Sequence, residues 1–319
     1  MFAAINMNKK VKIIVAGIGG VGGYFGGLLA NWYANNEHIE IYFISRGENL
    51  EAIRENGITI IEKDCYTIAN PTLVTDDPAK CGIADYLILC TKTYDLAALL
   101  EQLRPVINEN TLILPLLNGI DNVEKIQAQL PGISVLEACV YVVSRLQSPG
   151  IIENTGNLQK IFFGSSRIND NRPQQLESIL QQAGIDAHYT SAIRKLTWEK
   201  FLFISPVATA TSYFNNSIGQ LAEDPDKMAF VKQLLAETKS IALAMGIEMD
   251  TDISEKIINR ILSLPYENTS SMHSDYKKGK KETELESLTG YVIRKAAELN
   301  LRVPGFEKAY AHLSSRVNY

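Results

Sequence analysis

The stretch Val11-Lys-Ile-Ile-Val-Ala-Gly-Ile-Gly-Gly-Val-Gly22 decides the fold of the first half of this chain. Its apolar, β-branched start is typical of a strand buried in a parallel sheet. Gly17, Gly19 and Gly22 follow in the spacing G-x-G-x-x-G, where such a strand should turn into a helix. Residues 21–32 then carry apolar side chains at three- and four-residue spacing, which favours that helix. We therefore predict a strand, a glycine-rich turn and a helix.

Each glycine has its own physical role in a loop of this kind. Gly17 permits the tight turn, Gly19 lets the backbone approach a pyrophosphate, and Gly22 lets the helix pack closely on its strand. The phosphates would bind N–H groups at the positive end of the helix dipole. A plain glycine-rich turn is the alternative, but a second strand expected at residues 39–44 favours a dinucleotide site. The residues of this glycine loop are Gly17, Ile18, Gly19, Gly20, Val21 and Gly22.

The end of that second strand indicates which dinucleotide binds. A carboxylate there would bind the ribose 2′-OH of NAD, but this strand ends in Ser45-Arg46. A guanidinium and a hydroxyl would instead bind a 2′-phosphate, the guanidinium with two hydrogen bonds. We therefore predict NADPH as the cofactor, and the alternative interpretation of Arg46 is a solvated loop charge.

Composition and charge restrict the class of protein. The 319 residues, 46% hydrophobic and 21% charged, suit a globular protein of about two domains. The formal net charge of −5 gives no support for nucleic-acid binding. No apolar run approaches the length of a membrane span. We expect a small-molecule partner, and neither a nucleic acid nor a membrane.

The cysteines and the first residues bear on the compartment. The four cysteines form no C-x-x-C pair, so we expect buried, reduced thiols in a cytoplasmic protein. Residues 1–7 lack a charged segment followed by a long apolar core, so we expect no signal peptide. The four histidines are scattered, and we predict no metal site.

Strand and helix patterns alternate through the first half and give way to helical patterns in the second. This order predicts an α/β protein, with an N-terminal Rossmann-type doubly wound sheet followed by an all-helical C-terminal domain. We predict an NADP(H)-binding domain at residues 1–189 and a helical substrate and catalytic domain at residues 190–319, with the substrate between them. The further strands are expected at residues 58–61, 72–74, 85–90, 111–117, 135–143, 160–163 and 187–189. Further helices are expected at residues 50–55, 95–103, 123–130, 174–182, 197–213, 226–245, 253–262 and 282–300.

Polar residues stand at the ends of two of these strands and at the start of one helix. Lys92 follows residues 85–90, and Asn118 with Gly119 follows residues 111–117, at the edge where doubly wound sheets bind ligands. A solvated charge and a simple Asn-Gly turn are the alternatives for these two sites. In the second half, Lys200 opens an otherwise apolar helix, and Lys195 competes with it on chemistry alone. Glu284 and Glu286 suit the first turns of a helix without any catalytic role.

Over nearly its whole length the chain resembles the ketopantoate reductase (2-dehydropantoate 2-reductase) family. The order and spacing of the matching motifs are together quite specific. The motifs are the glycine loop, Arg46, Thr91-Lys92, Asn118-Gly119, Trp198-x-Lys200, Ser270-Ser271-Met272, and Thr283-Glu284 with Gly290.

The resemblance implies an activity and roles for these residues. NADPH would deliver a hydride to the C2 carbonyl of a 2-oxo acid, with 2-dehydropantoate, the precursor of pantoate in pantothenate and coenzyme A biosynthesis, as the first candidate. Lys200 would be the general acid, with Asn118 and Glu284 as further catalytic residues. Ser271, Lys200 and Asn118 would bind the substrate, and a homodimer is left open. Beyond the glycine loop and Arg46, the cofactor would contact Lys92, Asn118, Val143 and Glu284.

The chain departs from the family pattern on the helix that carries Lys200. The family has asparagines four and eight residues after its lysine, where this chain has Ile204 and Ala208. A third family asparagine aligns with Ile218, and compensation by Ser205, Asn215 or Asn216 is left open. Fewer amides favour a less hydroxylated substrate. A reductase of a more apolar 2-oxo acid, or a non-catalytic NADPH-binding protein or sensor, are therefore the alternatives.

Overall fold

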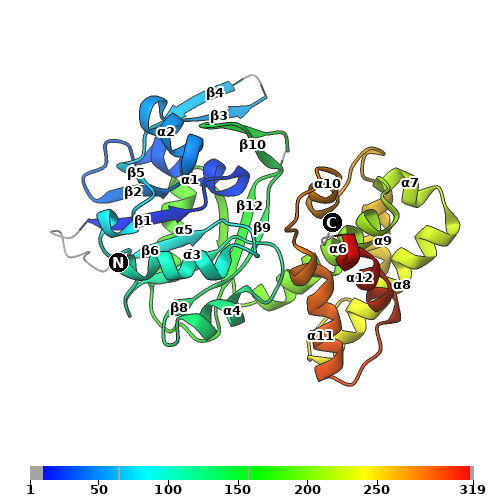
Figure 1. The fold of residues 1–319 in the computed structure, drawn as a ribbon. Coiled ribbons are helices and arrows are strands. Elements are labelled where there is room, and N and C mark those ends of the chain that lie inside the picture. The colour runs from blue at the N-terminus through cyan, green and yellow to red at the C-terminus, as the bar shows by residue number, and fades with distance from the viewer. Residues whose placement is uncertain (1–9, 64, 157, 317–319) are drawn as a thin grey trace. The chain divides into compact units, whose positions relative to one another are not determined.

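The strand before the glycine loop is β1 (Val11–Ala16), which lies inside a six-stranded sheet in a computed structural model of the protein (Figure 1). Ile13 and Val15 belong to one hydrophobic core, whereas Ile14 and Ala16 belong to another. All four side chains are fully buried, because successive residues of a strand point to opposite faces and both faces of this sheet are covered.

All neighbouring strands of this sheet are parallel, in the order β5-β2-β1-β6-β7-β8. The predicted Rossmann-type sheet is therefore confirmed. Its other strands are β2 (Ile39–Ile44), β5 (Leu73–Thr75), β6 (Tyr86–Leu89), β7 (Leu112–Pro115) and β8 (Ser134–Val135). The helices of this part are α1 (Gly20–Trp32), α2 (Gly47–Asn56), α3 (Leu96–Leu103), α4 (Asn122–Gln129) and α5 (Arg172–Gln182), with short 3₁₀ turns at Pro78–Cys81 and Arg104–Val106.

Two smaller sheets extend the α/β part beyond the prediction. One has the order β10-β11-β3-β4 and the other the order β13-β12-β9. Helix α1 packs on the first of them through its glycines. A Cβ atom on Gly23 would lie 2.4 Å from Ile152 Cδ1, and one on Gly27 would lie 2.7 Å from Ile60 Cδ1. The strands are β3 (Ile58–Glu62), β4 (Cys65–Ala69), β9 (Glu137–Tyr141), β10 (Ser144–Ser148), β11 (Ile151–Asn154), β12 (Lys160–Gly164) and β13 (Asp186–Tyr189).

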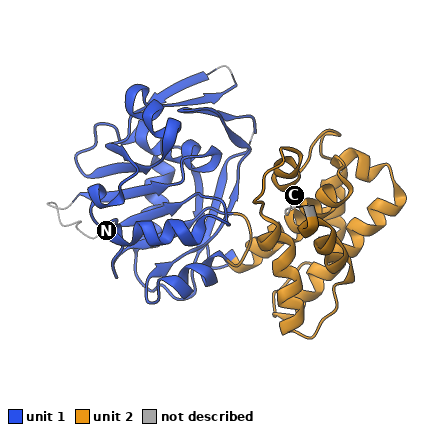
Figure 2. Ribbon diagram, viewed as in Figure 1, with its two compact units in different colours: residues 1–117, 122–193 blue, residues 118–121, 194–319 orange. Residues whose placement is uncertain are grey.

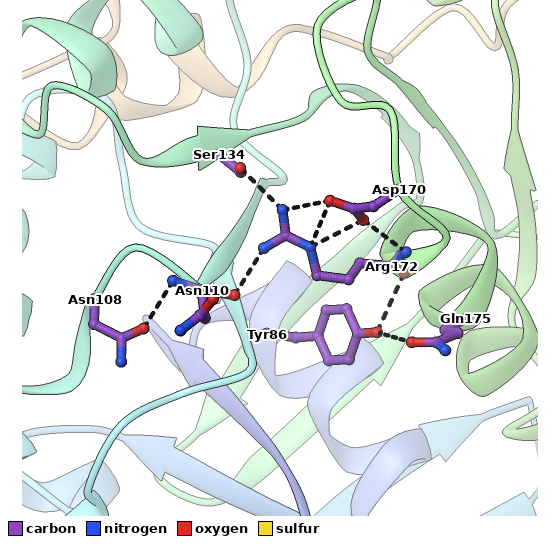
Figure 3. Close-up of polar contacts among 7 residues, drawn as sticks. All are labelled: Tyr86, Asn108, Asn110, Ser134, Asp170, Arg172 and Gln175. Carbon is purple, nitrogen blue, oxygen red and sulfur yellow. Dashed lines mark hydrogen bonds and ion pairs between the residues drawn. The ribbon is translucent and has the colours of Figure 1, made fainter. Parts of the chain in front are cut away.

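One arginine at the start of α5 connects this helix to the central sheet (Figure 3). The Arg172 guanidinium donates to both carboxylate oxygens of Asp170 at 2.7–3.0 Å, to Asn110 O at 2.8 Å and to Ser134 Oγ at 3.2 Å. The Tyr86 hydroxyl on β6 donates to Arg172 O at 3.2 Å. Arg172 therefore joins its own stretch of chain to Asn110 and Ser134 through its guanidinium and to Tyr86 through its carbonyl.

The remainder of the chain is helical. Its core is a third hydrophobic cluster, which is drawn from all of the long helices of this part. The Glu237 carboxylate on α8 accepts the Gly305 and Phe306 N–H groups at 2.9 and 3.1 Å, and so satisfies the start of α12. The elements are α6 (Ile193–Phe214), α7 (Ile218–Ala222), α8 (Pro225–Ala244), α9 (Ile253–Leu262), α10 (Ser271–Lys277), the π-helical segment η3 (Glu286–Gly290), α11 (Tyr291–Glu298) and α12 (Pro304–Arg316).

Several short elements differ from the expectations. Strands β4, β10 and β11 and helices α7, α10 and α12 were not predicted. The expected helix at residues 282–300 is instead η3 followed by α11. The expectation of buried thiols is wrong at Cys65, which is exposed on β4, whereas Cys81 and Cys139 are buried and Cys90 is partly buried.

The structure describes residues 10–63, 65–156 and 158–316. The chain divides into two compact units: residues 1–117 with 122–193 form the first, and residues 118–121 with 194–319 form the second (Figure 2). In the ranges described, no helix is long and apolar enough to cross a membrane. The expectation of no signal peptide concerns residues 1–7, which lie outside the described residues.

Candidate active site

The glycine loop begins at a position that only glycine can occupy. Gly17 has a φ of +93°, and a Cβ atom there would lie 2.8 Å from Thr91 N and 2.9 Å from Cys90 C. Its N–H donates to Ile44 O at 3.2 Å. The loop therefore passes between the ends of β2 and β6, where a side chain could not be accommodated.

The next glycines differ in their surroundings. A Cβ atom on Gly22 would lie 2.2 Å from Gly17 O and 2.8 Å from Cys90 Cβ, so this glycine allows α1 to pack closely on the loop. A Cβ atom on Gly19 would meet nothing within 4 Å, and Gly19 caps α1 without a side-chain hydrogen bond. The helix start thus combines open space with N–H groups at the positive end of a dipole. These features suit the pyrophosphate of a dinucleotide.

Arg46 lies directly after β2, at the N-cap of α2. Its side chain is 83% exposed, and its guanidinium is 3.8 Å from the Asp95 carboxylate. Ser45 before it is only 7% exposed. A cation and a hydroxyl therefore occupy the strand end where an acidic residue would favour NAD.

Lys92 and Val143, the other cofactor candidates of the first unit, lie in connecting segments. Lys92 follows β6 and is partly buried, and its carbonyl accepts the Asp95 N–H at 3.0 Å. Val143 follows β9, is 63% exposed, and its carbonyl accepts the Thr155 N–H at 2.9 Å.

Four predicted residues come together in the second unit, in what we call the polar cluster: Lys200, Asn118, Glu284 and Ser271. Lys200 Nζ donates to Asn118 Oδ1 at 3.3 Å, and Asn118 Nδ2 donates to Glu284 Oε2 at 3.5 Å. Ser271 Oγ donates to the same Glu284 oxygen at 3.4 Å. Glu284 is only 2% exposed, so these donors offset the cost of burying its carboxylate. The cluster joins an ammonium, an amide, a carboxylate and a hydroxyl that are distant in sequence.

Aromatic packing fixes the helix that carries Lys200. Trp198 is buried and meets Phe201 edge to face, with ring centroids 5.8 Å apart, and Tyr291 of α11 at 6.4 Å. A large ring in the core two residues before the lysine sets the rotation of α6. The motif Trp-x-Lys therefore anchors the ammonium beside Asn118.

Local backbone features place the other members of the polar cluster. Asn118 precedes Gly119, whose φ of +90° reverses the chain after β7. Ser271 is the first residue of α10, which Ser270 caps through the His273 N–H at 3.0 Å. Glu284 lies just before the π-helical segment η3, an irregularity that is frequent at functional sites.

Lys195, the competing lysine, lies in a different environment. Its Nζ is 2.7 Å from an Asp250 oxygen and 3.7 Å from a Glu199 oxygen. The hydrogen bond to Asp250 raises the pKa of Lys195. Its ammonium is thus part of an ion pair on the surface, whereas Lys200 belongs to the polar cluster.

Each residue that could compensate for the missing asparagines makes at least one hydrogen bond within the protein, but Asn216 Oδ1 is buried without a hydrogen-bond partner among the described residues. Ser205 is buried and donates to Leu288 O of η3 at 2.7 Å. Asn215 Oδ1 is 2.9 Å from His273 Nε2. Asn216 Nδ2 donates to Gln220 Oε1 at 3.1 Å. Ile204 is partly buried, and Ala208 and Ile218 are buried in the helical core.

Sequence reasoning did not single out Asn49, which contacts both the glycine loop and Ser45. The sequence places Asn49 four residues after Ser45 at the start of a helix, and this spacing could have indicated a contact between the two side chains. Within the described ranges no group of three or more metal-ligating side chains occurs.

Comparison with known proteins identifies similar proteins that cover both units. Residues 13–167 match the family described as “Ketopantoate reductase PanE/ApbA”, and residues 192–316 match “Ketopantoate reductase PanE/ApbA C terminal”. The “Uncharacterized oxidoreductase YkpB” of Bacillus subtilis is 28% identical over 95% of this chain and 98% of its own length. The “2-dehydropantoate 2-reductase” of Halobacterium salinarum is 25% identical over 92% of this chain and 95% of its own length. The solved structure of “2-dehydropantoate 2-reductase from Porphyromonas gingivalis W83” has a TM-score of 0.83 and 33% identity, and the match covers 96% of this chain and 99% of that one.

Proposed function

This chain belongs to the ketopantoate reductase family, and on that premise we propose that it reduces 2-dehydropantoate to pantoate with NADPH. Membership of this family supports the reduction of a 2-oxo acid by this chain as an NAD(P)-dependent oxidoreductase. The choice of NADPH and of 2-dehydropantoate is our proposal. The contacts that join Lys200, Asn118, Glu284 and Ser271 support it most directly.

The first unit has the features that NADPH needs. The glycine loop would hold the pyrophosphate, because Gly19 faces open space at the start of α1. Arg46 and Ser45 would hold the 2′-phosphate, because a guanidinium pairs well with phosphate oxygens. When bound, NADPH supplies the hydride that reduces the carbonyl.

Lys200 supplies the proton in this proposal. Its ammonium polarises the C2 carbonyl of the 2-oxo acid and donates a proton to the oxygen as the carbon gains a hydride, which gives the 2-hydroxy acid. Asn118 accepts a hydrogen bond from Lys200 and so orients its ammonium. When the substrate binds, the single hydroxyl hydrogen of Ser271 turns from Glu284 to the substrate carboxylate, while Glu284 continues to align Asn118.

A second candidate substrate is a 2-oxo acid with a more apolar side chain. The asparagine positions of the family helix are Ile204 and Ala208, and the Ser205 hydroxyl donates to Leu288 O. The amides of Asn215 and Asn216 contact His273 and Gln220. With Ile204 and Ala208 in place of two family asparagines, the substrate site would gain little from the hydroxyl of 2-dehydropantoate.

We expect the Lys200→Ala variant to lose about 10²- to 10⁴-fold in kcat on 2-oxo acids, the range for loss of a general acid. NADPH oxidation at 340 nm measures this loss. Lys195→Ala is the matched control, because it removes a lysine of the same helix that pairs with Asp250, and its turnover should stay close to that of the wild type.

A panel of 2-oxo acids separates the candidates in the same assay. Turnover of 2-dehydropantoate supports the first substrate, and turnover restricted to simple branched 2-oxo acids supports the second. If the wild-type protein reduces none of them, the reductase proposal is wrong and a binding or sensing role takes its place. Equal loss in the two lysine variants would refute the role of Lys200.

A further inference from the structure

Asn49 connects three separate segments at the adenosine end of the predicted cofactor site. Its Nδ2 donates to Ile18 O of the glycine loop at 2.8 Å and to Ser45 Oγ at 3.2 Å. Its Oδ1 accepts the N–H of Gly150, in the turn between β10 and β11, at 2.8 Å. All of these residues belong to the first unit. The side-chain amide therefore has a partner for both of its hydrogens and for its oxygen.

Two backbone partners fix which way this amide points. A carbonyl such as Ile18 O can only accept a hydrogen bond, and an N–H such as that of Gly150 can only donate one. Exchanging the amide oxygen and nitrogen of Asn49 would place two acceptors together at Ile18 and two donors together at Gly150. The contact to Ser45 therefore comes from the amide nitrogen, which can only donate.

Ser45 must accept this hydrogen bond, so the hydrogen of its own hydroxyl points elsewhere. In the parts of the chain that the structure describes, no acceptor receives that hydrogen. Ser45 lies directly after β2 and directly before Arg46 in the sequence, whose guanidinium is exposed. The hydroxyl is therefore held as a donor at the position where a ribose 2′ group is recognised in this fold.

We propose that Asn49 is a positioning residue for cofactor specificity, because it fixes the Ser45 hydroxyl as a hydrogen-bond donor to the 2′-phosphate. This inference rests on the proposed use of NADPH. A phosphate oxygen is charged and accepts a stronger hydrogen bond than a neutral 2′-hydroxyl. Fixing the hydroxyl therefore stabilises bound NADP(H) more than bound NAD(H).

Calorimetric titration with 2′,5′-ADP and 5′-AMP tests this role without any turnover, since the two ligands differ in the 2′-phosphate. We expect the Asn49→Ala variant to bind 2′,5′-ADP about tenfold more weakly, the usual effect of losing a hydrogen bond to a charged group. Its affinity for 5′-AMP should fall much less. Asn56→Ala is the control, since Asn56 is an exposed asparagine of the same helix that contacts only Ala52 O at 3.4 Å in the described chain, and it should change neither affinity.

A double variant shows whether Asn49 acts through Ser45. In the Ser45→Ala background, Asn49→Ala should leave the preference for 2′,5′-ADP unchanged, because the hydroxyl that it positions is gone. Asn49→Asp is the second variant if Asn49→Ala does not fold. This variant keeps an acceptor for the Gly150 N–H, but its carboxylate would accept the hydrogen of the Ser45 hydroxyl. Asn49→Asp should therefore also lower the preference for 2′,5′-ADP over 5′-AMP. The same substitution should lower that preference less in the Ser45→Ala background than in the wild type.

The outcomes separate this inference from the proposed function. A wild-type protein that binds 2′,5′-ADP no more tightly than 5′-AMP overturns the NADPH proposal, and the role of Asn49 with it. A wild-type preference that Asn49→Ala leaves intact, with equal losses for the two ligands, overturns the role of Asn49 alone. The role of Asn49 would also be wrong if Asn49→Ala changed the preference for 2′,5′-ADP over 5′-AMP equally in the wild type and in the Ser45→Ala background.

Discussion

In our proposal, Arg46 is the residue that most directly distinguishes the two nicotinamide cofactors, through its exposed guanidinium. Its only described ion-pair partner in the structure is Asp95, at 3.8 Å, and an exposed pair at this distance is weak. A 2′-phosphate carries more charge than this single carboxylate and accepts two hydrogen bonds from the guanidinium. Arg46 can therefore exchange Asp95 for a phosphate at low cost.

We expect the Arg46→Ala variant to weaken NADPH binding about 10- to 100-fold, the range for losing hydrogen bonds between charged groups. NADH binding should change by less than about twofold, because NADH lacks the 2′-phosphate. Fluorescence titration of each cofactor measures both. Arg54→Ala is the control, since Arg54 pairs with Glu51 on the same helix. Equal losses for NADPH and NADH would remove the proposed 2′-phosphate role.

In our proposal, the side chain of Ile204 influences which 2-oxo acid the protein prefers. It lies one helical turn after Lys200 and is partly buried. We expect Ile204→Asn to raise kcat/KM for 2-dehydropantoate relative to 2-oxoisovalerate about fivefold, the worth of one ordinary hydrogen bond. The comparison of the two substrates in one variant cancels any general loss of activity. A ratio that stays the same or falls would show that Ile204 does not face the substrate.

The residue pattern alone could identify part of the candidate site. The glycine spacing and the end of β2 indicate a cofactor site because local geometry dictates glycine and charge there. The polar cluster is different, because Lys200, Asn118, Glu284 and Ser271 come from four distant stretches of sequence. Taken alone, Glu284 suits a helix start and Asn118 suits a turn. Only the resemblance to a family grouped them before the structure placed them in contact.

At the scale of elements, most segments with clear periodicity were predicted, whereas the short β4, β10, β11, α7 and α10 and the longer α12 were not. Strands β10 and β11 have few residues, and β10 is largely exposed, so neither shows an apolar alternation. Helix α10 has seven residues, starts at Ser270-Ser271 and contains no regular apolar stripe. The segment η3 was expected as ordinary helix, because its sequence Glu286–Gly290 carries no signal that separates a π-helical turn from an α-helix. Tertiary contacts, which the local pattern does not contain, stabilise these elements.

The network around Arg172 predicts how α5 is attached (Figure 3). We expect Arg172→Ala to lower the free energy of unfolding by about 1–2 kcal/mol, since it removes hydrogen bonds to Asp170, Asn110 and Ser134 that are partly exposed. Chemical denaturation measures this loss. Arg167→Ala, which removes an arginine whose described contact is with Gln127, should cost much less, and equal effects would contradict the assigned role.

The same network has a predicted pH dependence. The hydrogen bond from Arg172 lowers the pKa of Asp170 below its ordinary value. The pair therefore stabilises the fold above the unfolded pKa of about 4, and this contribution is lost as the pH falls through the lower folded pKa. The destabilisation by Arg172→Ala should accordingly be largest near neutral pH and shrink in acid.

At the scale of the whole molecule, the class of each half could be predicted because the two kinds of core leave different patterns. β1 is buried on both faces and reads as a continuous apolar run. Helices such as α9 bury one stripe and read as periodic. The sheet β10-β11-β3-β4 could not be predicted, because its central pairing of β11 with β3 joins segments far apart in sequence, such as Ile151 with Thr59.

The assignment of Asn118–Asp121 to the second unit has a consequence for how this protein can be recombined. The chain leaves the first unit after Leu117, returns to it at Asn122 and leaves again after Ile193. A chimaera with a single junction near residue 193 would take Lys200, Ser271 and Glu284 from one parent and Asn118 from the other. If the first unit is to stay whole, the cluster can be transplanted intact only by moving residues 118–121 together with residues 194–319.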